Sequence, residues 1–554
     1  MKKLISLLLS LLLLATALPA FAASAPELKI AVASDLHYNL PEETLTLYTD
    51  DPVFGYANRR AAMENESGWI IDGFLNGAKK NGVDCVLISG DLADNGRRLP
   101  EEHYAVRDKL LAFEKETGIE VFVIDGNHDA GDNSATTLSD FKQIYKDLGY
   151  DHALSVRAED CSYTADLGEN YRLIALDSCD PTVSTEDGMS IAKVRWVLDE
   201  AKAAKDAGRQ PILMMHHNLL DHMPYQRIFS HNFIIRSHLA TAELFADAGI
   251  KVVLTGHEHC SDAAVYTSSL GNVIYDFATT SLTMYPLAYR LVRFTDAEIS
   301  YSEEFITSID TAALAEAVNG YTSEMLSAME ADLTAFSKQY LKKGVEYRLS
   351  QSLTMEKSGV SEGSLFYPLV EAAFSSLGGL LQMPLYGAGS AAEKAASYNI
   401  DIPATPCATG WDLATEFVAA HYAGGEHFDL TGPEVTALLR LASLILKDVP
   451  ADISDALFTG AAGAIADALT LKQAKALARS VFGGVTPGET FAAALVSNLV
   501  YGFTNDADGV DDNNGAIPGY GAANRAESLA HKIAAFFQKL LLRIKNFAAM
   551  IIGK

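Results

Sequence analysis

The strongest constraint on the fold is an alternation of short apolar runs with longer segments of helical periodicity, from residue 28 to residue 294. The apolar runs are rich in β-branched and aliphatic residues and occupy residues 28–33, 83–89, 119–124, 171–176, 211–215, 250–255, 272–277 and 288–294. Several are apolar almost throughout, as strands buried on both faces are. Helical periodicity falls between them, at 58–80, 101–116, 137–148, 191–207 and 237–248. The alternation predicts a layered α/β domain in which helices cover a sheet.

The composition changes near residue 300, beyond which the chain is rich in Ala and Leu. Helix-like spacing there covers 311–342, 364–381, 433–447, 463–481 and 489–499, with a loop-like interruption at 387–410. Pro433 stands in the first turn of one such segment, a favoured place for proline. A chain of 554 residues also exceeds what one core usually organises. We therefore expect an α/β domain over 27–300 and a mostly α-helical domain over 305–500.

The first residues have the features of a secretory signal peptide. Met1-Lys2-Lys3 precedes an apolar stretch over 4–18, and Ala20-Phe21-Ala22 has the small-x-small pattern of a cleavage site. The apolar stretch is shorter than the roughly 20 residues that a membrane-spanning helix needs. We expect residues 1–22 to be removed by cleavage near Ala22, which predicts a secreted or cell-surface protein.

The last residues divide into two segments of opposite charge. Residues 501–528 are acidic and glycine-rich and predict a solvated linker, because the EF-hand calcium template fails there. Residues 529–554 predict a basic amphipathic helix with Lys532, Lys539 and Arg543 on its polar face. Two interpretations of this helix stay open: it lies on an anionic membrane surface or cell envelope, or it packs against the helical domain.

Charge and cysteine content narrow the set of partners. The net charge of −28 argues against a nucleic-acid-binding role, because phosphate backbones are bound by clustered Lys and Arg. The five cysteines are scattered and form neither a disulfide framework nor a zinc knuckle. Cys161 and Cys179 flank the expected strand at 171–176, so a disulfide across a hairpin and buried free thiols both stay open. Nothing in the sequence indicates an oligomeric state.

Five short clusters of His, Asp and Asn follow the expected strands. They are Asp35-Leu36-His37, Gly90-Asp91, Gly126-Asn127-His128-Asp129, His216-His217 and Gly256-His257-Glu258-His259. Residues at positions i and i+2 of an extended chain point to the same side, so Asp35 and His37 can hold one cation. The same spacing relates His257 and His259. Open α/β sheets bind ligands at the carboxyl ends of their strands, which favours one shared site over five unrelated turns.

The residue types in these clusters suit phosphoester chemistry. The carboxylate of Asp91 has two oxygens, which can bridge two cations, and Asn127 offers a neutral carbonyl oxygen to a hard metal. His128 can donate a proton to a departing alkoxide. Asp129 is expected behind the ligands, where it orients a histidine. Because neighbouring strand residues point to opposite sides, only one residue of His216-His217 contacts the site.

In this order the motifs resemble the calcineurin-like metallophosphoesterase superfamily, over roughly residues 28–295. The run at 90–96 is most similar to the branch of purple acid phosphatases and class III cyclic nucleotide phosphodiesterases, and the leader fits a secreted bacterial type. The resemblance implies a β-sandwich flanked by helices and a binuclear metal centre bridged by Asp91. It implies one metal site formed by Asp35, His37 and His259, and a second formed by Asn127, His216 and His257. His128 has the place of the family's histidine that contacts the phosphate and assists the leaving group.

Two departures from the family pattern affect these expectations. Asn218 stands where many relatives have proline, and the doubled histidine leaves the ligand open there, with His216 favoured by its position in the motif. No tyrosine lies beside Asp91, so a purple iron(III) centre is disfavoured. Mixed oxygen and imidazole ligands suit two divalent transition metal ions, among which Mn, Fe, Zn, Co and Ni stay open.

The resemblance predicts an exported phosphoric ester hydrolase in which a metal-bridged hydroxide attacks phosphorus while His128 assists the leaving group. Phosphodiesters are favoured over phosphomonoesters, and export favours extracellular nucleotides, phospholipid headgroups and envelope phosphodiesters as substrates. The alternative is a surface-binding protein with a vestigial or structural metal site, but such a site would not require His128. The substrate-binding residues stay open, with candidates at Tyr38, Asn39, Arg97, Arg98, Tyr225, Arg227 and His231.

Overall fold

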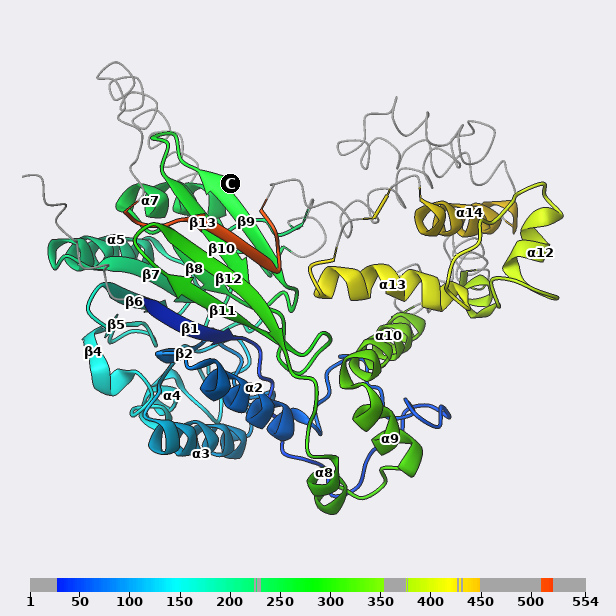
Figure 1. The fold of residues 1–554 in the computed structure, drawn as a ribbon, viewed down its shortest axis with the longest axis horizontal. Coiled ribbons are helices and arrows are strands. Elements are labelled where there is room, and N and C mark those ends of the chain that lie inside the picture. The colour runs from blue at the N-terminus through cyan, green and yellow to red at the C-terminus, as the bar shows by residue number, and fades with distance from the viewer. Residues whose placement is uncertain are drawn as a thin grey trace, which may run out of the picture.

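The computed structural model describes residues 27–223, 226, 231–352, 375, 377–425, 428–429, 432–448 and 510–521. Two β-sheets form the centre of the N-terminal part (Figure 1). The six-stranded sheet contains, in spatial order, β13 (Asn514–Pro518), β12 (Glu298–Phe305), β11 (Ala288–Phe294), β1 (Leu28–Ala33), β2 (Cys85–Ile88) and β3 (Glu120–Val123). The seven-stranded sheet contains β4 (Ala153–Val156), β5 (Tyr163–Leu167), β6 (Tyr171–Leu176), β7 (Gln210–Met215), β8 (Val252–Thr255), β10 (Val273–Ala278) and β9 (Asp262–Thr267).

Parallel pairing gives both sheets a common direction where the polar clusters stand. Strand β1 pairs parallel with β2, and β2 pairs parallel with β3. In the second sheet β6, β7, β8 and β10 form a parallel run. The carboxyl ends of neighbouring parallel strands lie at one edge of a sheet, so the loops that follow these strands are brought together.

The two sheets face each other across one hydrophobic core. Ile30 of β1, Leu173 of β6 and Met214 of β7 all belong to this core. The alternate residues of the second sheet, such as Ile174 and Leu213, enter a separate core. This alternation follows from the two-residue period of a strand, which sends successive side chains to opposite faces. The central strands β6, β7 and β8 are therefore buried on both faces, which explains their nearly continuous apolar runs.

Helices cover the outer faces of the sandwich. They are α2 (Ser67–Asn81), α3 (Pro100–Thr117), α4 (Leu138–Ile144), α5 (Ile191–Asp206) and α7 (His238–Ala248), with a short 3-10 turn, η1 (Tyr150–His152). Helices α5 and α7 pack on the seven-stranded sheet, whereas α3 contacts β3 of the six-stranded sheet and α2 packs against α3 (Figure 1). The expected α/β class is confirmed, and so is the β-sandwich flanked by helices that the family resemblance implies.

The C-terminal region is helical, as its composition predicts. The described helices are α8 (Thr311–Ala317), α9 (Ser323–Ala331), α10 (Leu333–Ser352), α12 (Ala391–Ala396), α13 (Gly410–Tyr422) and α14 (Pro433–Asp448). Leu314 of α8, Met329 of α9 and Phe336 of α10 belong to the same core as the sheets. Helices α12 to α14 have a core of their own, around residues such as Leu413 and Leu444. The first C-terminal helices thus continue the packing of the sandwich.

Some element boundaries differ from the sequence-based expectations. The helix expected at 58–80 begins only at Ser67, because Ala61 has a left-handed backbone (φ 61°) and the chain turns there. The helix expected at 311–342 is divided into α8, α9 and the first half of α10, with breaks where Val318 and Asp332 are extended. The loop expected at 387–410 contains α12 and the start of α13.

The described part of the expected linker, 510–521, forms strand β13 at the edge of the six-stranded sheet. Ile299 of β12 pairs with Ile517 of β13, and Ile517 is buried in the main core. The hydroxyl of Tyr520 donates to the carbonyl of Pro211 at 2.7 Å. One buried side chain in a strand of five residues leaves no periodic signal, so the acidic composition concealed this strand.

The expected signal peptide, the helices at 463–481 and 489–499, and the basic helix at 529–554 lie outside the described residues. Among the helices of the described ranges, none combines the length and hydropathy needed to cross a bilayer.

Candidate metal centre

The five polar clusters meet between the carboxyl ends of the two sheets. Asp35 follows β1, Asp91 follows β2 and Asn127 follows β3 in the six-stranded sheet. His216 and His257 follow β7 and β8 in the seven-stranded sheet. Side chains that are far apart in the sequence thereby form two neighbouring groups of metal-ligating type, Asp35 with His37 and His259, and Asp91 with His216 and His257. These are called the first and the second ligand group below.

The loops that carry these side chains have an unusual backbone. Asp35, His37, Asp91, His257 and His259 all have positive φ, between 39° and 67°. Positive φ is rare for residues other than glycine and costs on the order of 1–3 kcal/mol each where the residue is held there. Such strain concentrates at functional sites, because it persists only where the surrounding structure fixes it. The ligand loops are therefore built for position at the expense of local stability.

Gly90 shows how closely the loops approach each other. Its φ is 104°, and a Cβ added to it would lie 2.6 Å from Nδ1 of His216. Any larger residue would displace the histidine ring, so this glycine is required both for the turn and for the contact between the sheets.

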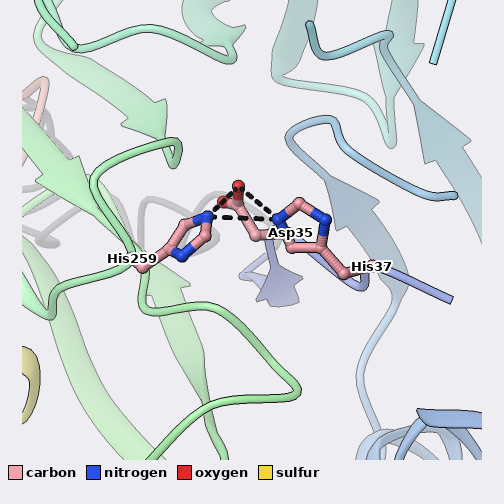
Figure 2. Close-up of side chains that lie close together, drawn as sticks. All are labelled: Asp35, His37 and His259. Carbon is pink, nitrogen blue, oxygen red and sulfur yellow. Dashed lines mark hydrogen bonds and ion pairs between the residues drawn. The ribbon is translucent and has the colours of Figure 1, made fainter. Parts of the chain in front are cut away.

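Figure 2 shows the first ligand group, in which the side chains converge from two loops, the one after β1 and the one after β8. Nε2 of His37 and Nε2 of His259 are 3.1 Å apart. Oδ1 of Asp35 lies 3.1 Å from Nε2 of His259 and 3.7 Å from Nε2 of His37. The other oxygen of Asp35 accepts from the hydroxyl of Ser34 at 2.5 Å and from the amide of His257 at 2.9 Å. Oδ1 is buried without a hydrogen-bond donor, so it is the oxygen that is left for a cation.

The second ligand group is more deeply buried. Nε2 of His216 lies 2.9 Å from Oδ1 of Asn127 and 3.4 Å from Oδ2 of Asp91. Nδ1 of His216 donates to the carbonyl of Ser89 at 2.9 Å, and Nε2 of His257 donates to the carbonyl of Asn232 at 3.3 Å. A carbonyl oxygen can only accept, so these contacts leave the other nitrogen of each ring with its lone pair.

Asp91, a member of the second ligand group, also reaches the first. Its Oδ2 lies 3.7 Å from Nε2 of His37 in the first group and 3.4 Å from Nε2 of His216 in the second. Its Oδ1 accepts from the amide of His128 at 2.8 Å. One carboxylate is therefore shared by both groups, the place that the sequence analysis expects for a bridging ligand.

The electrostatics of the centre indicate a surplus of negative charge. Burial opposes the charged form of His216, but the carboxylates of Asp91 and Asp35 outweigh burial and raise the pKa of His216 to about 10. Burial likewise opposes ionisation of Asp91, yet the neighbouring histidines hold the pKa of its carboxyl well below the usual range. Burial lowers the pKa of His37 to about 4 and that of His257 to about 3, so both rings are neutral at pH 7. His37 and His257 therefore have the neutral state that metal binding requires, whereas His216 must release a proton when a cation binds.

The hydrogen-bond geometry of the first group also fits a cation. Nδ1 of His259 lies 3.1 Å from the sulfur of Met284, which has no hydrogen, so Nδ1 is the donor. Nδ1 of His37 faces Oδ1 of Asp94 at 3.0 Å and carries the other hydrogen. The two Nε2 lone pairs then oppose each other at 3.1 Å, beside the undonated oxygen of Asp35. A divalent cation among these atoms would satisfy all of them, so the residues present fit the metal that the family implies.

The neighbouring residues His128 and Asp129 make different contacts. Nδ1 of His128 donates to the carbonyl of Asp94 at 2.8 Å, and its half-buried ring packs edge-on against His37. Asp129 accepts instead from the amides of Gly126 at 2.8 Å and Ala93 at 3.0 Å. Asp129 is expected to orient a histidine; its Oδ1 lies 4.0 Å from Nδ1 of the buried His103, and its carboxylate also ties together the two loops that carry Asp91 and His128. It supports the site through the backbone.

Of the doubled histidines, it is His216 that reaches the centre. His217 turns to the other side, where its Nδ1 lies 2.9 Å from the hydroxyl of Ser178. Both rings are fully buried. The alternation of a strand separates the two, as expected. Cys161 and Cys179 are buried free thiols, so no disulfide crosses the hairpin.

The candidate substrate residues are dispersed. Tyr38 is buried, the amide of Asn39 is bonded to the Ser67 hydroxyl, and a guanidinium nitrogen of Arg97 donates to the carbonyl of Asp180. Arg98 and His231 are exposed. Tyr225 and Arg227 lie outside the described residues. The described candidates therefore give no substrate pocket of their own.

Three residues beside the ligands were missed by sequence reasoning: Arg60, Asp94 and Met284. Arg60 lies at ion-pair distance from Asp94, whose carboxylate faces His37. Met284 contacts His259. Asp94 stands in the run at 90–96 and was within reach of motif analysis, whereas Arg60 and Met284 follow no motif and approach only through the fold.

Comparisons with known proteins define the class of this domain. Residues 28–261 match the family model described as calcineurin-like phosphoesterase. This part of the chain is a calcineurin-like phosphoesterase domain, the domain of a metal-dependent phosphoesterase family, and the superfamily resemblance is confirmed.

Solved structures include similar chains. A dimetal phosphatase from Danio rerio is 12% identical with a TM-score of 0.38, covering 50% of this chain and 96% of its own. A conserved predicted phosphoesterase from Streptococcus pneumoniae is 13% identical with a TM-score of 0.23, covering 51% and 92%. A protein from Thermus thermophilus is 10% identical with a TM-score of 0.26, covering 51% and 100%.

Proposed function

We propose that this protein is an exported phosphoesterase that works with two divalent transition metal ions. The observation that carries the proposal is the position of Asp91, one oxygen of which faces His37 of the first ligand group and His216 of the second. A carboxylate shared by two sets of nitrogen and oxygen ligands is typical of two-metal hydrolytic centres.

In this proposal Asp35, His37 and His259 hold one metal, while Asn127, His216 and His257 hold the other. Two such cations, when bound, polarise the phosphoryl oxygens and acidify a water molecule that serves as the nucleophile. The buried walls of the centre strengthen every charge interaction within it, because water is excluded there. The chain itself supplies the position of the ligands and the handling of the leaving group.

His128 is the residue we assign to the leaving group. Its Nδ1 hydrogen is held by the carbonyl of Asp94 at 2.8 Å, so Nε2 is the nitrogen that remains for a second proton. A protonated His128 can then give the Nε2 proton to the departing alkoxide.

The proposed substrates are phosphodiesters in preference to phosphomonoesters, on the basis of the likeness of residues 90–96 to the phosphodiesterase-containing branch. The proposed location is outside the cytoplasm, on the basis of the leader at 1–22. Contact with a membrane surface or cell envelope through the basic segment 529–554 is part of the same proposal, as is the absence of a nucleic-acid-binding role. Deleting residues 529–554 tests the surface contact, since liposome association should fall and unchanged association would refute it.

The function is tested by reloading metal-depleted protein with Mn, Fe(II), Zn, Co or Ni. Hydrolysis of bis(p-nitrophenyl) phosphate is measured beside that of p-nitrophenyl phosphate. We expect activity only with metal, and higher kcat/KM for the diester. Protein that binds metal yet hydrolyses neither ester would favour the surface-binding alternative. A higher kcat/KM for the monoester would refute the substrate preference alone.

A further inference from the structure

The segment between β1 and α2 brings a guanidinium group to the first ligand group. Nη1 of Arg60 contacts Oδ1 of Asp94, whereas Nη2, 3.2 Å from Nδ1 of His37, makes no hydrogen bond there, because both nitrogens carry hydrogen. The same oxygen of Asp94 is 3.0 Å from Nδ1 of His37. This carboxylate keeps the hydrogen of His37 on Nδ1, which leaves Nε2 free for the metal side. Arg60 therefore acts on His37 through Asp94, whose charge and direction it fixes.

Arg60 stands on a tight turn built around Asn58. The side-chain oxygen of Asn58 accepts from the amide of Arg60 at 3.0 Å, and its carbonyl accepts from the amide of Ala61 at 3.0 Å. The side-chain amide of Asn58 donates to the carbonyl of Ala62 at 3.1 Å. Ala61 has a φ of 61°, so the turn is strained and depends on its surroundings.

Helix α10 supplies those surroundings. A Cβ added to Gly344 would lie 2.6 Å from the Cα of Ala61 and 2.6 Å from the carbonyl oxygen of Asn58. Only glycine lets the helix backbone come so close to the turn. The rings of Tyr340 and Tyr56, with centroids 4.9 Å apart, extend the contact along the helix. The turn that carries Arg60 is thus seated on the C-terminal helical region.

His259, on the other side of the first ligand group, is also supported through the C-terminal helices. Met284, whose sulfur accepts from Nδ1 of His259, is buried in a small cluster with Leu341 and Val345 of α10 and Ala419 of α13. His259 is therefore backed by a residue that packs against α10 and α13, and the Arg60 behind His37 stands on a turn whose Ala61 packs in the same cluster. In the second group, His216 is held by Ser89 and His257 by Asn232, both from the phosphoesterase domain.

We infer that Arg60 and Met284 are positioning residues for the first metal site, and that α10 sets both, so that the helical region controls the affinity of that site and not of the second. The inference rests on the proposed two-metal function. In this inference the helical region has a structural role within the same chain. Its helices support the residues behind the first metal site, which the sandwich alone does not hold in place.

The test is calorimetric titration of Mn²⁺ into metal-depleted full-length protein. Arg60→Gln should weaken one of two binding steps about 10- to 100-fold, the usual effect of losing a residue behind a ligand. Arg60→Lys should recover part of that loss. Met284→Leu, which keeps the volume but removes the acceptor, should weaken the same step by a smaller factor. Arg59→Gln is the matched control, because Arg59 is exposed beside the same turn, and it should bind both ions as wild type does.

Gly344→Ala tests the role of α10 without touching the centre. It should weaken the same binding step, whereas Gly378→Ala, where the added Cβ meets nothing within 4 Å, should not. In a His259→Ala background, which lacks the first site, Arg60→Gln should change nothing further.

Equal weakening of both steps, or wild-type affinities in Arg60→Gln and Gly344→Ala, would overturn the inference and leave the two-metal function standing. If the wild-type protein bound neither Mn²⁺ nor any other of the proposed metals, both the inference and the two-metal function would be overturned. If Arg60→Gln fails to fold, as judged by circular dichroism, Arg60→Lys and Gly344→Ala decide between these outcomes.

Discussion

The two ligand groups of the centre lie side by side but differ in what holds them. The second group is fixed by main-chain carbonyls of the sandwich, at Ser89 and Asn232. The first group is fixed by the side chains of Arg60, Asp94 and Met284; Met284 packs against the C-terminal helices, and Arg60 stands on a turn that contacts them at Ala61. The difference teaches that the sandwich holds one half of the site through its own backbone, whereas side chains near the C-terminal helices support the other half.

Asp91→Asn gives the largest expected effect, because it breaks both halves together. An amide cannot carry the negative charge that two cations share, so we expect both metals to be lost. Turnover should fall on the order of 10⁴-fold, about 5.5 kcal/mol of transition-state stabilisation. Elemental analysis and a diester assay check this. Full retention of two metals per chain would contradict the shared position of Asp91.

His128→Ala should leave both halves intact and remove only the proton donor. We expect turnover to fall roughly 10³-fold, in the middle of the range for general acid catalysis, with the metal content unchanged. The loss should be smaller for an ester whose leaving group is a weak base, such as p-nitrophenolate, than for an alkyl ester. Equal losses for both esters would remove His128 from the leaving-group role.

Single-ligand variants should separate the halves. His259→Ala should lose the first metal and keep the second, because the contacts of His216 and His257 do not involve His259. His216→Ala should instead lose the second metal, and with it part of the first through Asp91. Metal counts after dialysis distinguish the two. Loss of both metals in His259→Ala would show that the halves are not separable.

A smaller effect concerns the stability of the junction that carries Arg60. Burial raises the pKa of Glu66 to about 7, while the hydroxyl of Tyr321 donates to its carboxylate and partly offsets the rise. A carboxyl with a raised folded-state pKa contributes its full stability below its unfolded pKa near 4.5, and loses it as pH rises through about 7. The melting temperature of Glu66→Gln should therefore exceed that of wild type by a margin that grows between pH 5 and pH 8. The corresponding gain in the free energy of unfolding is at most about 3 kcal/mol. A constant difference across that range would refute the assignment.

The sequence could predict the residues that follow the strands of the sandwich better than those that approach the site from elsewhere. The ligands could be found because each follows a predicted strand and the motifs keep a fixed order, as Asp35-x-His37 and His257-x-His259 do. Parallel strands then bring their carboxyl ends together, so the shared site follows from the fold class.

The remainder depended on contacts between distant segments. Arg60 lies in a stretch with helical periodicity, but the hydrogen bonds of Asn58 and the close approach of Gly344 hold a turn there instead. Strand β13 is short and carries one buried side chain, Ile517, so pairing with β12 decides its structure rather than its own pattern. Asp129 also accepts from three backbone amides, which only the fold brings to its carboxylate.

The most direct test of the central claim is the dependence of turnover on bound metal in the wild-type protein. Metal-depleted protein is titrated with Mn²⁺ while metal content and diester hydrolysis are followed in the same samples. The account predicts two ions per chain, with turnover that rises steeply only as the second ion binds. Full turnover with one ion bound, or turnover unaffected by metal removal, would contradict it.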